Sequence, residues 1–324
     1  MARIHPAAAR MIATGHRTEP QYWLRAYRLV IASSIPIPEM VTADVRDRGG
    51  RPDVVIAEGQ FPDDLPDPLG SSAVHQVNAQ ALLLRVDGVG RYLIRDGREI
   101  LIDAHPAATA HDLRVYLLGT CLGALLHQRG FLVLHASGVV TDQACVLFAG
   151  DSGAGKSTVL AEFLRRGFKM VVDDVCAVRF DAAGRPIVVP SYPRTRLWAD
   201  AAARFEINTA NLPRTRPSWD KFERQVTDQF SYREAVLTHL FHLAGPYEGE
   251  EILMERLGPI DAFKTLVDNT YRGILLDGLD LRTSHFGLAS RAASSVQVIR
   301  VKRPEKSNSV EEIASLVLGS VGEA

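Results

Sequence analysis

The sequence predicts a mixed α/β protein with a mostly β domain over residues 1–110 and an α/β domain over residues 111–324. Three observations support this prediction. The 324 residues suit two domains, because domains commonly span about 100 to 200 residues. Short alternating apolar runs, separated by turn residues, fill the first third of the chain. Near the middle, an apolar strand pattern leads through a glycine-rich turn into a helical pattern.

The composition is that of an ordinary globular protein, with 46% hydrophobic residues, 23% charged residues and a formal net charge of −1. We therefore expect neither nucleic acid nor a membrane surface as an electrostatic partner. The chain has no apolar run of about 18 residues, and its first 15 residues lack the apolar stretch of a secretory signal. These features predict a cytoplasmic protein. Its cysteines lie in apolar runs without metal-ligand spacing, which indicates buried free thiols.

The first domain is predicted to consist mainly of strands. Its two proline-rich pieces, residues 35–38 and 61–69, resist helix because proline lacks the backbone donor and restricts the residue before it. The alternating runs predict strands over residues 27–31, 54–57, 82–86, 91–94 and 99–102.

The second domain is predicted to begin with a helix over residues 112–128, for which Asp112 is a suitable N-cap. Apolar spacing predicts further helices from the glycine-rich turn to Arg166, near residues 235–243 and around residues 260–267. Ser309 and Glu312 form a capping-box pattern ahead of a last helix. Short apolar runs predict strands over residues 131–135, 138–140, 145–149, 170–172, 176–180, 187–189 and 296–301.

The glycine-rich turn has the sequence Gly-Asp-Ser-Gly-Ala-Gly-Lys-Ser and satisfies the phosphate-loop spacing G-x-x-x-x-G-K-[ST]. In such a loop the backbone N–H groups and the helix N-terminus bind phosphate, the lysine reaches the β- and γ-phosphates, and the serine hydroxyl ligates Mg²⁺. A turn with a purely backbone role is disfavoured, because the strand, the helix and the Lys-Ser pair are all present. The predicted nucleotide-binding residues are Gly150, Asp151, Ser152, Gly153, Ala154, Gly155, Lys156, Ser157 and Thr158.

Two further features lie near this loop in the sequence. Asp173 and Asp174 follow an apolar strand, an arrangement by which phosphate-loop proteins hold Mg²⁺ or orient a nucleophile. A solvated pair at a strand end is the alternative. Neighbouring strand residues point to opposite sides, so we expect only one carboxylate to face the phosphates. His135 lies one strand earlier, and a lone histidine there is more often a core residue than a catalytic one.

Together these features resemble the catalytic core of the HPr serine kinase/phosphorylase family. His135 lies fifteen residues before Gly150, an Arg-Gly turn follows the loop helix, and Asp174 lies eighteen residues after Lys156. The resemblance implies a phosphate-loop kinase fold related to phosphoenolpyruvate carboxykinase, with ATP and Mg²⁺ as cofactors. It implies that Asp174 is the general base, His135 a supporting catalytic residue, Lys156 the phosphate clamp, Ser157 a metal ligand and Asp173 a second-shell or metal partner.

The sequence also departs from that family. Thr158 stands where the family usually has glutamate, and residues 190–198 read Pro-Ser-Tyr-Pro-Arg-Thr-Arg-Leu-Trp instead of a Glu-Val-Arg-Gly type stretch. The second metal-ligating glutamate and the phosphorolysis activity are therefore not implied. This stretch resembles HPr-kinase-like proteins of peptide-modifying clusters, as do the segments from Tyr27 to Pro38 and from Leu132 to Gly138. That group includes the lasso-peptide precursor kinases. HPr kinases assemble as hexamers, so a homo-oligomer is a further expectation from the family.

The resulting hypothesis is a serine kinase that transfers the γ-phosphate of Mg·ATP to a hydroxyl of a protein or ribosomal peptide. A small-molecule kinase and a nucleotide-binding regulatory protein without transfer remain the alternatives. Guanidinium groups bind phosphate and carboxylate bidentately, whereas a solvated surface charge is the alternative for each basic residue. The candidates for binding transferred phosphate or substrate are Arg194, Arg196, Lys221 and Arg224.

Overall fold

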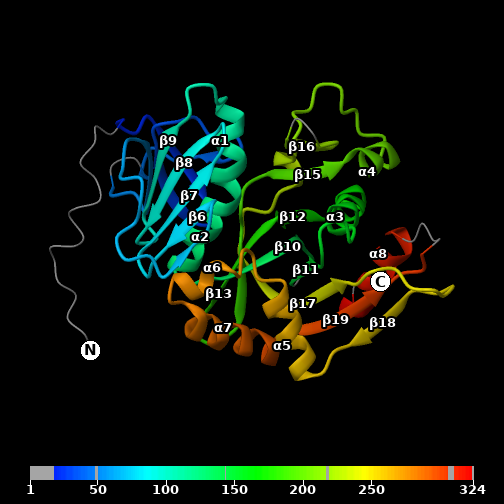
Figure 1. Ribbon diagram of the computed structural model, residues 1–324. Coiled ribbons are helices and arrows are strands. Elements are labelled where there is room, and N and C mark those ends of the chain that lie inside the picture. Colours follow the sequence, from blue (N-terminus) through cyan, green and yellow to red (C-terminus); the bar gives the residue numbers. More distant parts are fainter. Residues whose placement is uncertain (1–17, 48–49, 143, 217–218, 306–309, 323–324) are drawn as a thin grey trace. The chain divides into compact units, whose positions relative to one another are not determined.

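The computed structural model describes residues 18–47, 50–142, 144–216, 219–305 and 310–322. Its chain divides into two compact units, here called unit 1 and unit 2. Of the described residues, unit 1 holds those up to Arg25, Leu29–Arg129 and Ile274–Arg282, and unit 2 holds Ala26–Arg28, Gly130–Gly273 and the residues from Thr283 onward. Both units combine sheet and helix (Figure 1), so the mixed α/β prediction is confirmed. None of the helices in these ranges has the length and apolar character that crossing a bilayer requires.

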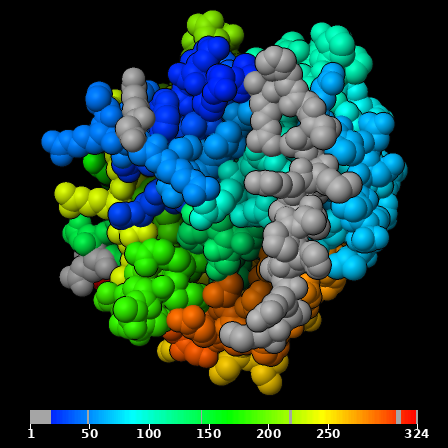
Figure 2. All heavy atoms as spheres, turned by 90° about the vertical axis from the view of Figure 1, so that its left-hand side faces the viewer, coloured from blue at the N-terminus to red at the C-terminus, as the bar shows by residue number. Residues whose placement is uncertain are grey.

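Unit 1 is built on a mixed sheet with the strand order β3-β1-β2-β4-β9-β8-β7-β6-β5 in the described residues. Its atoms appear in blue to cyan in Figure 2. The side chains of Leu83, Leu93 and Leu101 are buried on one face with Phe61 and Leu65. The strands are β1 Tyr22–Ala26, β2 Leu29–Ser33, β3 Val41–Thr42, β4 Val54–Glu58, β5 Gly70–Ser71, β6 His75–Val77, β7 Ala81–Val86, β8 Gly90–Arg95 and β9 Glu99–Ala104.

The helical segment after β9 belongs to unit 1, whereas the sequence placed it at the start of the second domain. It consists of α1 Ala110–Tyr116, a π-helical turn η3 Leu117–Cys121 and α2 Leu122–Gln128. Thr109, and not Asp112, is the N-cap, and Asp112 completes a capping box from the third helical position. The hydroxyl of Tyr92 on β8 donates to the carbonyl of Leu113, which ties the helix to this sheet. The boundary therefore lies after Arg129 and not at residue 110.

The predicted strand over residues 27–31 is a turn followed by a strand. Tyr27 and Arg28 have positive φ values of 53° and 58° and separate β1 from β2. Neither residue type favours this backbone conformation, so the sequence carried no turn signal here. The other four predicted strands of the first domain are confirmed as β4, β7, β8 and β9.

Unit 2 contains a twisted sheet with helices on both faces. Apolar side chains of α3 and α8 are buried on one face, and those of α5 and α7 on the other. The strands of this sheet are β10 Leu132–Val140, β11 Cys145–Ala149, β12 Lys169–Val172, β13 Val175–Phe180, β14 Pro186–Val189, β17 Ala235–Leu243, β18 Leu253–Arg256 and β19 Gln297–Lys302. A separate two-stranded sheet consists of β15 Arg194–Trp198 and β16 Lys221–Gln225. The helices are α3 Lys156–Arg165, α4 Ala199–Arg204, α5 Pro259–Asp268, α7 Arg282–Ser295 and α8 Val310–Val321, with the short turns η4 Thr227–Gln229 in unit 2 and α6 Leu275–Gly278 in unit 1.

The helix predicted near residues 235–243 is wrong, because this segment forms β17. The strand pairs in parallel with β11 and with β19 and is covered on both faces. A strand buried on both faces loses the polar alternation that would distinguish it from a buried helix. The two strands predicted over residues 131–135 and 138–140 are parts of one continuous strand, β10. The three cysteines are buried free thiols, as predicted, whereas Ser309 and the N-terminal 15 residues lie outside the described ranges.

Candidate active site

The strand register of unit 2 brings three distant segments together. The first half of β10 pairs with β13, where His135 lies opposite Val175, and the second half pairs with β12, where Gly138 lies opposite Val172. On the other edge of β10, Ala136 lies opposite Ala149, the last residue of β11. The bend between β12 and β13 therefore lies on one side of His135 and the start of the glycine-rich loop on the other.

The glycine-rich loop, residues 150–157, joins β11 to α3. Gly150 has a φ of 139°, and a Cβ there would lie 2.5 Å from the carbonyl oxygen of Leu243, so only glycine fits this position. Gly153 and Gly155 also have positive φ values, of 88° and 103°, but face open space. The loop thus leaves room for a ligand at the N-terminus of α3, where backbone N–H groups bind anions.

Lys156 is the first residue of α3, and its side chain is buried. Its ammonium group donates to the carbonyls of Gly150 at 2.6 Å and Asp151 at 2.9 Å. Burial lowers the pKa of Lys156, while the carboxylates of Asp173 and Asp174 oppose that shift. The ammonium is therefore held inside the loop, close to two carboxylates and without a direct ion pair in the described residues.

Asp173 is buried and accepts three hydrogen bonds. Its Oδ1 accepts from the hydroxyl of Ser137 at 2.6 Å, and its Oδ2 accepts from the hydroxyl of Thr195 at 2.9 Å and the backbone N–H of Arg196 at 2.8 Å. Ionised carboxyl oxygens offer about four lone-pair sites, so little acceptor capacity remains. These contacts fix the bend after β12 and leave room for at most a peripheral role in metal binding.

Asp174 adopts a positive φ of 76°, which turns the chain out of the strand. Its Oδ2 accepts from the guanidinium of Arg196 at 2.6 Å, and its Oδ1 lies 3.2 Å from Nδ1 of His135. Burial favours the neutral acid, but Arg196, His135 and Lys221 together lower the pKa of Asp174 far below its usual range. Asp174 is thus an ionised carboxylate at neutral pH.

The contacts of His135 fix its tautomer. Nδ1 lies 3.1 Å from the backbone carbonyl of Asp174 as well as near its carboxylate. Both partners are acceptors, so Nδ1 carries the proton and donates it. The imidazole therefore presents a donor to the Asp174 carboxylate and helps to hold it in place.

Arg196 is held by two acidic groups. Its Nε donates to Oε1 of Glu223, which is buried on β16 directly opposite Arg196 in the register, and its Nη1 donates to Asp174. Its Nη2 is buried and has no hydrogen-bond partner among the described residues. A buried donor without a partner is costly, so this group is a candidate for contact with a ligand oxygen.

The four predicted basic residues do not share one environment. Arg196 and Lys221 line the site, and the ammonium of Lys221 also lies 5.5 Å from the ring centre of Trp198. Arg194 is buried in a 2.6 Å ion pair with Glu223, and Arg224 donates to Gln229 at 3.4 Å. Neither Arg194 nor Arg224 lines the cavity described next.

These side chains surround a cavity of about 400 Å³, here called the carboxylate cavity. Contrary to the expectation for a strand end, both aspartates line it, because the chain bends between them. The sequence did not predict Ser137, Trp198 and Asp200 in the lining, or Thr195 and Glu223 behind it. Of these residues, only Ser137 could have been found from the sequence, because it lies two residues after His135 on the same strand. The lining residues are His135, Ser137, Ser152, Gly153, Gly155, Lys156, Ser157, Thr158, Asp173, Asp174, Arg196, Trp198, Asp200 and Lys221.

The donor set fits a nucleotide and the Mg²⁺ that accompanies it. The open glycines, the Lys156 ammonium and the unpartnered Nη2 of Arg196 are all suited to phosphate oxygens. Within the described residues no group of three or more His, Cys, Asp and Glu side chains could hold a metal. Mg²⁺ needs only one or two protein ligands when phosphates supply others, and the hydroxyl of Ser157 offers such an oxygen.

Among the comparisons with known proteins, only solved structures give a match. No family model matches the chain, and no curated protein matches it. Among solved structures, the chain is similar to the Hpr(Ser) kinase/phosphatase from Coxiella burnetii, with 15% sequence identity, a TM-score of 0.32, and coverage of 59% of this chain and 97% of that chain.

Proposed function

We propose that this protein is a serine kinase that transfers the γ-phosphate of Mg·ATP to a hydroxyl of a protein or ribosomal peptide. One observation carries the proposal: Lys156 of the glycine-rich loop and the ionised Asp174 line the same cavity. Phosphoryl transfer needs a group that holds the phosphates and a group that receives the hydroxyl proton, within reach of each other.

The residues of the carboxylate cavity suggest a division of roles. Loop N–H groups and Lys156 would bind the β- and γ-phosphates, and Ser157 would hold Mg²⁺, which would supply charge neutralisation at the phosphate oxygens. The substrate hydroxyl oxygen attacks the γ-phosphorus as the bond to the β,γ-bridging oxygen breaks, and its proton passes to Asp174. Because a carboxylate of low pKa is a weak base, we expect proton transfer to be late, which suits the loose transition state of phosphoryl transfer.

The proposed acceptor is a serine hydroxyl of a protein or ribosomal peptide. A precursor peptide of the lasso type lies within this class, and the reaction would take place in the cytoplasm, where ATP is available. Lys221 beside Trp198 gives the cavity a cationic and aromatic wall that suits a peptide carboxylate or side chain. A small-molecule acceptor and a regulatory role without transfer are the competing outcomes of the test below.

The role of Asp174 is tested by Asp174→Asn. We expect transfer of label from γ-labelled ATP to an arrayed library of serine-containing peptides to fall at least about 100-fold, the lower range for a general base. Affinity for Mg·ATP, measured by calorimetry, should stay within about threefold, because Asp174 is not assigned to phosphate binding. Asp228→Asn, on an exposed turn of the same unit, is the matched control. Retained transfer in Asp174→Asn would contradict the base assignment.

Lys156→Ala separates binding from chemistry. Loss of the ammonium should weaken Mg·ATP binding or slow the single-turnover rate, and the two effects are distinguished by calorimetry and rapid-quench kinetics. Unchanged binding and unchanged rate would remove the loop from the proposed mechanism.

A further inference from the structure

A second cavity, of about 380 Å³, lies beside the carboxylate cavity and is lined by residues of unit 2. Gly153, Gly155, Thr158 and Asp200 line both cavities. A ligand whose phosphates lie on the glycine-rich loop can therefore extend into either space. The proposed function uses the carboxylate cavity and leaves this second one, here called the side cavity, without a role.

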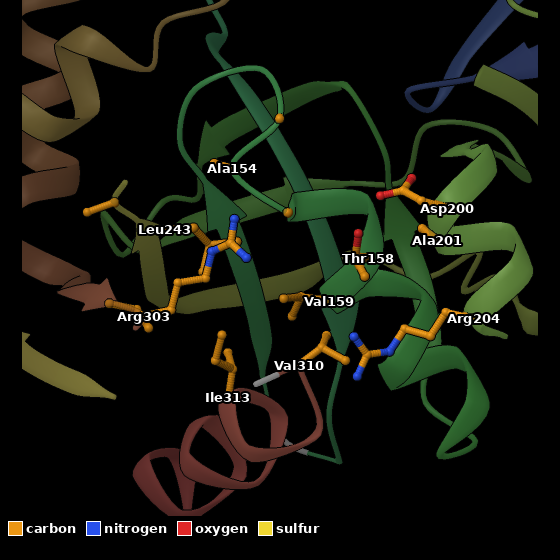
Figure 3. A pocket seen from close by; sticks show the side chains of 14 residues that line it. Ala154, Thr158, Val159, Asp200, Ala201, Arg204, Leu243, Arg303, Val310 and Ile313 are labelled. Carbon is orange, nitrogen blue, oxygen red and sulfur yellow. The ribbon is translucent and has the colours of Figure 1, made fainter. Parts of the chain in front are cut away.

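Apolar side chains form two walls of the side cavity, whose lining also includes polar groups. The wall beside α3 and β17 is formed by Val159 and Leu243, and the wall beside α8 by Val310 and Ile313 (Figure 3). A cavity of this size and character is typical of small-molecule and cofactor sites, in which a few polar groups fix the ligand's orientation.

Two arginines supply the main polar groups. Figure 3 shows the side chains of Arg204 and Arg303 reaching inward from opposite sides of the side cavity. Arg204 forms an ion pair with Glu311 at the start of α8, which fixes its position. Nε of Arg303 is buried and has no hydrogen-bond partner among the described residues. Because Arg303 lines the side cavity, a ligand bound there would complete the contacts of this guanidinium.

We propose that the side cavity binds the nucleoside half of the nucleotide, with the base between the apolar wall and the guanidinium groups of Arg303 and Arg204. This inference rests on the proposed function. Guanidinium groups stack on aromatic rings and on bases, and apolar side chains cover the other face of a base. Asp200, which lines both cavities, offers a carboxylate acceptor for a ribose hydroxyl on the path between them.

The inference also sets the direction of the nucleotide. With the base in the side cavity and the phosphates on the loop, the γ-phosphate points toward Asp174 and Arg196. The acceptor must then enter through the carboxylate cavity, along the wall that holds Trp198 and Lys221. A small anionic effector in the side cavity is the alternative, and it would leave nucleotide affinity independent of this space.

The proposal is tested with a variant whose larger side chain fills the side cavity, by comparing its affinities for Mg·ATP and Mg·tripolyphosphate with those of the wild type. Ala244 lines the cavity and donates its backbone N–H to the carbonyl of Val301, a bond that a larger side chain leaves intact. We expect Ala244→Phe to weaken Mg·ATP binding at least tenfold, about 1.4 kcal/mol, and to leave Mg·tripolyphosphate binding within about twofold, both measured by calorimetry. Ala203→Phe, on the exposed side of α4, is the matched control and should change neither affinity.

Arg303→Gln supplies a second variant in case Ala244→Phe does not fold, which a thermal melt would reveal. It should lower Mg·ATP affinity by several-fold and spare tripolyphosphate. If either folded variant binds Mg·ATP as tightly as the wild type, or if the wild type binds ATP no better than tripolyphosphate, the inference is wrong and the proposed function stands. If the wild type binds neither ligand, both the inference and the proposed function fail.

Discussion

Asp174 is held by two side chains from different strands, His135 on β10 and Arg196 on β15. Arg196 is held in turn by Glu223, and Asp173 by Ser137 and Thr195. Asp173, Asp174 and Glu223 therefore each have their own donors and are fixed before any ligand arrives. Such preorganisation is what phosphoryl transfer requires of a site, because catalysis there is mostly positioning and electrostatics.

Single residues also mark the limit of sequence reasoning. Lys156 and Asp174 were found through motif spacing, but Glu223 and Thr195 belong to no motif. Arg194 and Arg196 are two residues apart on one strand and share a face, so the sequence could not tell which would line the cavity. Which arginine lines the cavity depends on Glu223, whose position opposite Arg196 is set by the pairing of β15 with β16.

A prediction at this scale concerns Glu162 of α3, which is fully buried and bonded to Arg165 and Arg166. Burial raises the pKa of Glu162, but the two arginines outweigh it and the net pKa is lowered. We expect Glu162→Gln to reduce the free energy of unfolding at pH 7 by about 1–2 kcal/mol. Hydrogen bonds to charged groups stabilise most when they are buried, but both arginines reach solvent, which reduces their contribution.

The pH dependence follows from the direction of that shift. A lowered pKa in the folded state stabilises the fold above the unfolded value of about 4.3, and the contribution is lost as the pH falls through the lower folded value. The difference between wild type and Glu162→Gln, measured by urea denaturation, should be constant from pH 8 to 5 and shrink below about pH 4. Glu248→Gln, at an exposed position, is the control. A difference that grows on acidification would contradict the assignment.

At the scale of elements, strands with polar alternation or clear turn residues were predictable, as β4 and β7 to β9 show. The segment that became β17 was not, because both faces are buried. The bend at Asp173 and Asp174 was also missed, since it depends on side-chain contacts from β10 and β15 and not on turn residues. The glycine-rich loop was predictable because its backbone conformation demands glycine at fixed positions.

Gly150→Ala tests that demand. A methyl group there would lie 2.5 Å from the Leu243 carbonyl at a φ of 139°, so we expect a loss of about 1–3 kcal/mol in stability and weaker Mg·ATP binding. The contrasting variant is Gly287→Ala in α7, where a Cβ meets nothing within 4 Å. Alanine favours a helix over glycine by roughly 0.5–1 kcal/mol, so this variant should be stabilised. Equal effects in both, by thermal and urea unfolding, would contradict the loop geometry.

At the scale of the whole molecule, neither unit is one continuous stretch of chain. Unit 2 includes Ala26–Arg28, and unit 1 includes Ile274–Arg282. The sequence predicted a single boundary at residue 110, because composition and periodicity report local structure and not which distant segments pack together. Tyr27 shows the consequence: its N–H donates to the carbonyl of Pro190 and its hydroxyl to that of Val175, all within unit 2.

Tyr27→Ala tests this arrangement. The ring is buried and packs edge-on against Tyr192 at a centroid distance of 6.2 Å. We expect a loss of about 3–5 kcal/mol in the free energy of unfolding, the usual cost of truncating a buried aromatic residue. Tyr22→Ala, at a position 37% exposed, should cost no more than about 0.5 kcal/mol. Similar losses in both variants, by urea denaturation, would show that Tyr27 is not part of the core of unit 2.

We propose that the glycine-rich loop and Asp174 together transfer phosphate to a hydroxyl. The most direct measurement incubates the wild-type protein and Asp174→Asn with γ-labelled or α-labelled ATP, Mg²⁺ and a library of serine-containing peptides. The account predicts acid-stable label on serine from γ-labelled ATP alone, dependent on Mg²⁺ and absent from Asp174→Asn. Bound ATP without label on any peptide, or equal labelling by wild type and Asp174→Asn, would contradict it.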